Sequence, residues 1–217
     1  MTAMNAFARE GGAYLIADTA GYHSDGTVLG FAEKVVTDAR LAMMIGICGR
    51  AAREVEDRIE AWLADQPDQT TAFARLSAFL CQLVDEAEEE DDGEAGDLPD
   101  GIRLTLAWWD ADAQEGRCGI MASTPDLAGG AETFALRPVR TLFMPALEGS
   151  DLWPGHSFDP EADALALAEH QRRCDHGDGR ARVGGQMILY RVAADGITSR
   201  ELSRWADLIG RPIMVMT

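Results

Sequence analysis

The chain has 217 residues, of which 47% are hydrophobic, and its formal net charge at pH 7 is -18. This length and apolar content predict a single domain, residues 1–217, with a substantial core. The negative charge argues against binding to nucleic acid or an anionic membrane, because both require a positive field. No apolar run approaches the roughly 20 residues of a membrane span, and the N-terminus lacks a signal-peptide pattern, so we expect a cytoplasmic protein.

The first fifty residues contain three stretches that predict strands. They are residues 12–18 (GAYLIAD), 30–36 (GFAEKVV) and 41–48 (LAMMIGIC). Asp18 closes the first stretch and Lys34 lies near the end of the second, so we expect an ion pair across adjacent strands. Residues 46–49 then lead from strand to helix, where backbone N–H groups can face an anion.

Lys34 is unusual in this composition, because the other basic residues apart from histidine are all arginine. Arginine is a permanently charged planar fork, whereas lysine is a compact ammonium that can lose its proton and tune a neighbouring base. A lone lysine on a solvated strand has no function of its own. A lysine beside a carboxylate and a nucleophile instead predicts a catalytic site.

Thr2, Asp18, Lys34 and Gly46 are spaced sixteen, sixteen and twelve residues apart. In this spacing the sequence resembles the proteasome β-subunit-like branch of the N-terminal nucleophile (Ntn) hydrolases, including the bacterial peptidase that partners an unfolding ATPase. The resemblance covers the first 65 residues and is architectural afterwards. It implies an α+β fold, a four-layer αββα sandwich in which two antiparallel sheets lie between helix layers.

The resemblance also implies a mechanism. Removal of Met1 would expose Thr2, whose hydroxyl is the nucleophile and whose α-amine, with a pKa near ~8, is the base. Lys34 would lower the pKa of both groups, Asp18 would hold Lys34, and the Gly46 N–H would bind the oxyanion. The implied substrate is an amide, above all a peptide bond, and the implied partner is the chain itself, because family members assemble into rings. No cofactor is expected.

The second half departs from the family pattern. An active member carries a Ser-Gly-Gly turn with helper Ser and Asp residues, and this chain has only loose counterparts in Gly149-Ser150, or in Ser157 and Asp159. A non-catalytic subunit of the same fold, working in assembly or binding, is therefore an alternative. A second alternative is a metal- or partner-binding protein, using either an acidic stretch or the donors His170, Cys174 and His176.

The remaining elements follow from periodicity and turn residues. Residues 85–100, rich in acids and without a base, predict a mobile solvated loop. The four cysteines are widely scattered, which suits reduced thiols better than disulfides. Predicted helices are 51–64, 70–89, 161–174 and 198–208, and predicted strands are 102–110, 117–124, 132–136, 139–144, 184–194 and 212–216.

Overall fold

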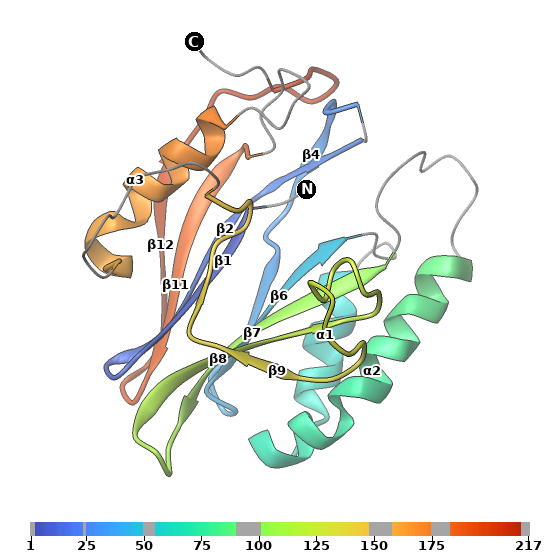
Figure 1. Ribbon diagram of the computed structural model, residues 1–217, viewed down its shortest axis with the longest axis vertical. Coiled ribbons are helices and arrows are strands. Elements are labelled where there is room, and N and C mark those ends of the chain that lie inside the picture. The colour runs from blue at the N-terminus through green and yellow to red at the C-terminus, as the bar shows by residue number, and fades with distance from the viewer. Residues whose placement is uncertain are drawn as a thin grey trace.

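The computed structural model describes residues 3–23, 25–49, 55–89, 101–147, 158–174 and 183–213. Strands account for 41% and helices for 26% of the structure. The strands form two five-stranded antiparallel sheets and one two-stranded sheet, and the two larger sheets face each other (Figure 1). The molecule is therefore mainly antiparallel β.

The first large sheet has the strand order β10-β1-β2-β11-β12. Its centre is β2, in which all seven residues are buried, because one face meets the second sheet and the other meets a helix. The pairing of β1 with β2 places Met4 opposite Ala17, and the pairing of β11 with β2 places Met187 opposite Asp18. The bounds are β1 Met4–Arg9, β2 Gly12–Asp18, β10 Thr141–Leu142, β11 Gln186–Ala193 and β12 Gly196–Arg204.

The second large sheet has the strand order β5-β6-β7-β8-β9. Alternate residues of β7 face opposite sides, so Leu104 and Leu106 meet the helices while Ala107 meets the first sheet. The bounds are β5 Val35–Asp38, β6 Met43–Gly49, β7 Ile102–Asp110, β8 Glu115–Ala122 and β9 Arg137–Val139.

A two-stranded sheet links the large ones. It consists of β3 Ala20–Tyr22 and β4 Val28–Phe31, which follow β2 and precede β5. This hairpin has its own small core of Ala20, Tyr22, Val28 and Ile213. The chain thus leaves the first sheet, turns back through the hairpin and enters the second sheet.

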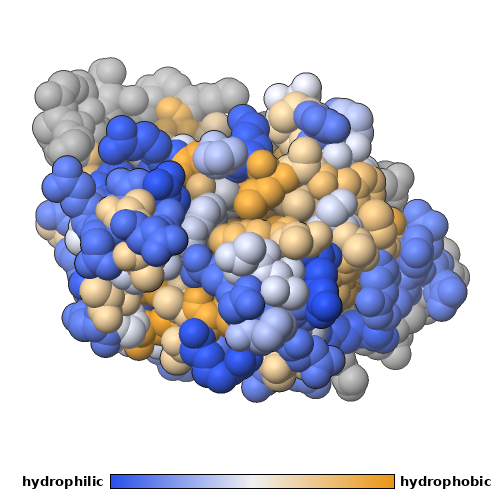
Figure 2. Space-filling model, turned by 90° about the horizontal axis from the view of Figure 1, so that it is seen from below, coloured by the Kyte–Doolittle hydropathy of each residue, from blue (hydrophilic) through white to orange (hydrophobic). Residues whose placement is uncertain are grey.

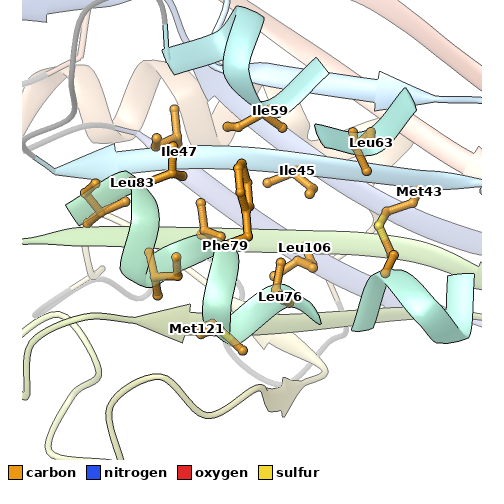
Figure 3. Close-up of a cluster of buried hydrophobic side chains, with 14 of the residues drawn as sticks. Met43, Ile45, Ile47, Ile59, Leu63, Leu76, Phe79, Leu83, Leu106 and Met121 are labelled. Atoms are coloured by element: carbon orange, nitrogen blue, oxygen red, sulfur yellow. The ribbon is translucent and has the colours of Figure 1, made fainter. Parts of the chain in front are cut away.

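Helices α1 Val55–Ala64 and α2 Gln69–Glu89 pack on the outer face of the second sheet. Apolar side chains recur along α2 at three- and four-residue intervals and form one buried face. This face meets residues of β6, β7 and β8, and Figure 3 shows Leu76, Phe79 and Leu83 pointing toward Ile45 and Leu106. Helix α3, Pro160–Arg173, packs on the first sheet through Leu167 and its neighbours.

The predicted four-layer αββα sandwich is wrong. The structure has three sheets and is richer in strand than that architecture, and its described residues contain three helices rather than the four expected. The main reason is residues 198–208, predicted as a helix, which instead lie largely in β12 and pair with β11. The hairpin β3-β4 adds the third sheet, because the predicted strand 30–36 is divided between β4 and β5.

Other sequence predictions fall partly outside the described residues. Of the acidic stretch 85–100, residues 85–89 are the end of α2, and residues 90–100 lie outside the described part.

No described helix is both long and apolar enough to cross a bilayer. Hydrophilic residues cover much of the face seen from below, with hydrophobic ones visible between them (Figure 2).

Replacing Leu76 with alanine should lower the free energy of unfolding by about 2–5 kcal/mol, because the side chain is fully enclosed between α2 and the second sheet. Urea denaturation followed by circular dichroism measures this change. The matched control is Leu165→Ala on α3, where the side chain is 47% exposed; it should change stability by less than about 1 kcal/mol. Equal losses in the two variants would contradict the packing described.

Candidate active site

Asp18 is the centre of the candidate site. It closes β2 and its side chain is fully buried. Oδ1 accepts hydrogen bonds from Lys34 Nζ at 2.7 Å and from the Ala3 N–H at 3.2 Å, and Oδ2 accepts one from the Gly184 N–H at 3.0 Å. Three donors from three distant parts of the chain thus converge on one carboxylate.

Lys34 lies in the connection between β4 and β5, not on a strand beside β2. Its Nζ also donates to the Ala20 carbonyl at 2.6 Å, and 11% of its side chain is exposed. The two preceding residues are held as well: the Ala32 N–H donates to the carbonyl of Thr19, the residue between β2 and β3, and Tyr190 of β11 donates its hydroxyl to Glu33. The connection therefore holds the lysine rigidly against the end of β2.

The electrostatic state of Asp18 follows from opposing influences. Burial raises the pKa of its carboxyl, while the charge and hydrogen bond of Lys34 and the Gly184 and Ala3 N–H groups act to lower that pKa. A buried carboxylate without its cation would be strongly disfavoured. Asp18 and Lys34 therefore depend on each other.

Thr2, the predicted nucleophile, lies outside the described residues, which begin at Ala3. The Ala3 N–H and the Lys34 Nζ bind the same oxygen of Asp18, at 3.2 and 2.7 Å. These two nitrogens therefore lie close to each other. The Asp18 N–H donates in return to the Ala3 carbonyl. Ala3 is thus fixed beside the ion pair.

Gly46 lies in the middle of β6 rather than in a turn from strand to helix. Ile47 N–H donates to Lys34 on the β5 side, so the alternation along the strand turns the Gly46 N–H toward Thr105 of β7. The same alternation directs the N–H of Gly49 toward the β5 edge, beyond the last residue of β5 that pairs there. Gly49 is exposed and has a positive φ of 108°. Of the two glycines, its amide is the better placed to meet an anion.

Sequence reasoning missed the support on the far side of Asp18. Gly184 and Gly185 form a turn in which the first N–H binds Asp18 and the second binds Asp207 at 2.8 Å. Asp207 makes a two-point ion pair with Arg172 of α3, at 2.6 and 3.0 Å. A bulkier residue at Gly184 would place its Cβ 2.3 Å from Ile213. In the sequence, the Gly-Gly pair before a buried strand is the feature that could have indicated this support.

Of the other candidate residues, the structure describes Asp159, His170 and Cys174, and all three belong to helix α3 or its caps. Asp159 is the N-cap of α3, where it accepts a hydrogen bond from the Glu161 N–H. Gly149, Ser150, Ser157 and His176 lie outside the described residues. His170 lies in the last turn of α3 and Cys174 is its C-cap, where burial raises the pKa of the thiol. Within the described part of the chain, no three His, Cys, Asp or Glu side chains are grouped as metal ligands.

Comparison with known proteins identifies no relative: no protein-family model matches the sequence, and no curated protein matches it. The geometry of the site therefore carries the functional argument.

Replacing Lys34 with methionine should lower the free energy of unfolding by about 3–5 kcal/mol at pH 7, because it leaves a buried charge without its partner. Loss of Lys34 also removes an influence that lowers the pKa of Asp18, so the folded pKa moves further above the 3.8 of the exposed group. The folded state then keeps a proton that the unfolded state releases, and stability falls as pH rises from 3.8 toward the folded pKa. The loss should thus be larger at pH 7 than near pH 4.

Urea denaturation at both pH values measures this difference. The control is Arg173→Met, whose side chain is 68% exposed and pairs with Glu169; it should cost less than about 1 kcal/mol at either pH. A Lys34→Met penalty that is small, or that does not change with pH, would contradict the coupling of Asp18 to Lys34.

Proposed function

We propose that this chain is an N-terminal threonine hydrolase that cleaves an amide, most directly a peptide bond. The observation that supports it is the convergence of the Lys34 ammonium and the Ala3 N–H on one buried oxygen of Asp18. A lysine held by a carboxylate, directly beside the peptide that follows a threonine, is the arrangement that such a nucleophile needs.

The proposed reaction begins when removal of Met1 frees the Thr2 α-amine. This amine takes the proton of the Thr2 hydroxyl, and the oxygen attacks the carbonyl carbon of the substrate. The amine proton passes to the leaving nitrogen as the C–N bond breaks, and an ester to Thr2 remains. Water then attacks the ester, with the amine again acting as base, and releases the acid product.

Lys34 serves this chemistry through its positive charge. An ammonium next to the hydroxyl and the amine lowers the pKa of both, so more of the base is free at neutral pH. Asp18 accepts one hydrogen bond from the ammonium, and the Ala20 carbonyl accepts a second, so the ammonium is held in one position. A point charge held at two sides contributes to the transition state without reorganising during the reaction.

The oxyanion of the intermediate requires N–H donors. Because the Gly46 N–H faces β7, we assign this role to the Gly49 N–H at the open edge of β6. Self-assembly into a ring, which the resemblance implies, belongs to the same proposal; light scattering after size-exclusion chromatography gives the number of copies.

The purified native protein should begin at Thr2 and react there with an epoxyketone, which can bond to both the hydroxyl and the amine of an N-terminal threonine. Intact mass and peptide mapping measure both results. Lys34→Arg should abolish labelling while the melting temperature changes little, because the planar guanidinium cannot present one point charge in the same space.

Two threonine variants serve as controls. Thr2→Ala should remove labelling, and Thr37→Ala, at an exposed threonine of β5, should leave it unchanged. Retention of Met1 in essentially all molecules would refute the catalytic proposal and favour a non-catalytic binding subunit. Equal labelling of wild type and Lys34→Arg would remove Lys34 from the mechanism.

A further inference from the structure

Arg103 is a buried cation without a counter-ion among the residues that the structure describes. Among the described residues, only Asp18 and Arg103 are both formally charged and classed as buried, and Arg103 is 4% exposed. No described carboxylate lies within ion-pair distance of its guanidinium. One Nη contacts the sulfur of Met144, and Nε has no hydrogen-bond partner within the described structure. The chain as a whole has the opposite balance of charge, because its acidic residues outnumber its basic ones and its formal net charge is -18.

A second orphan polar group lies beside it. The buried hydroxyl of Thr105 also has no hydrogen-bond partner in the part of the chain that the structure describes. Residues 103 and 105 lie on the same face of β7, the face that meets the first sheet, because residues alternate along a strand. Two buried polar groups without a hydrogen-bond partner in the described structure, the Arg103 Nε and the Thr105 hydroxyl, lie on one strand face and call for an explanation by a bound molecule.

These two residues adjoin the candidate active site. The register of β6 with β7 places Cys48 opposite Arg103 and Gly46 opposite Thr105. Burial raises the pKa of Cys48, while the charges of Arg103 and Lys34 and a hydrogen bond from Arg103 act to lower that pKa, so the thiol lies beside Arg103 and within electrostatic reach of Lys34. The Met4 N–H binds the Met144 carbonyl, which brings the contact residue of Arg103 next to the start of β1.

The chemistry of Arg103 and Thr105 favours an anion as the bound molecule. A neutral water satisfies a hydrogen bond but does not balance a buried charge. Asp18 is already balanced by Lys34, so the positive charge of Arg103 is the excess one in this region. A carboxylate offers two acceptor oxygens, one for a guanidinium N–H and one for the Thr105 hydroxyl.

We propose that Arg103 and Thr105 form a subsite for a carboxylate of the substrate, next to the Asp18–Lys34 pair. The inference rests on the proposed hydrolase function and names its substrate class: amides that carry a carboxylate close to the cleaved bond. Met144 covers the subsite in the free protein. Its flexible thioether, only half-buried, moves aside when the carboxylate takes its place on the guanidinium.

The test compares matched peptides. One pair has an amidated C-terminus and differs by Glu or Gln beside the cleaved bond; a second pair keeps Gln and has a free or an amidated C-terminus. The wild type should cleave one acidic member with kcat/KM about 30-fold or more above its neutral match, since a desolvated charge pair is involved. The pair that shows the preference identifies the source of the carboxylate.

Variants assign the preference to the subsite. Arg103→Met should reduce the ratio of the two rates to about one, and Thr105→Val, which keeps the volume and removes only the hydroxyl, should reduce it in part. Arg200→Met, an exposed arginine on β12, should leave it unchanged. If Arg103→Met does not fold, Thr105→Val carries the comparison. Equal kcat/KM values of the wild type for the acidic and the neutral member, in both peptide pairs, would refute the subsite.

A binding measurement separates this proposal from the hydrolase proposal. Glutarate should raise the melting temperature of the wild type above that in sodium chloride of equal ionic strength, and should not do so for Arg103→Met. This result in a protein that cleaves no peptide would refute the proposed function and retain the carboxylate subsite. No effect of glutarate on the wild type would refute the subsite.

Discussion

The buried ion pair of Asp18 and Lys34 joins the two large sheets. Asp18 ends a strand of the first sheet, and Lys34 immediately precedes a strand of the second. Between them the chain makes the hairpin β3-β4. The 32–34 connection is then fixed to the first sheet by Glu33, which accepts a hydrogen bond from Tyr190, and by Lys34, which donates to Asp18. Because a carboxylate enclosed in this position requires its cation, the ion pair determines where the second sheet begins relative to the first.

Most elements with a clear period could be predicted from the sequence. The strand 12–18, the hairpin of β7 and β8, and the helices α1, α2 and α3 show apolar alternation or three- and four-residue spacing over enough residues to decide their type. The β12 segment could not be assigned in this way. It is an edge strand with mostly exposed residues, so its polar sequence resembles a capped surface helix, and its pairing with β11 decides the structure.

The candidate site was predictable only where spacing along the chain carried information. Asp18 and Lys34 are sixteen residues apart, and their types indicate an ion pair without knowledge of the fold. The Gly184 N–H reaches Asp18 from 166 positions away, a contact that sheet pairing alone creates. Arg103 resembles any other arginine in an Arg-rich chain, and only its burial distinguishes it. The register of β6 likewise turned the Gly46 amide away from the predicted anion.

The two large sheets also meet where no side chain separates them. A Cβ added at Gly116 of β8 would lie 2.0 Å from the backbone of Gly12, so here the sheets touch main chain to main chain. Such a contact acts as a pivot, since the sheets can neither approach further nor slide past each other at that point. The opposite ends of these strands, where β2 and β8 finish, are Asp18 and Ala122. There Asp18 is bound to Lys34, which immediately precedes β5 of the second sheet, so β2 is fixed to the second sheet near both of its ends, by main-chain contact at Gly12 and by the buried ion pair at Asp18.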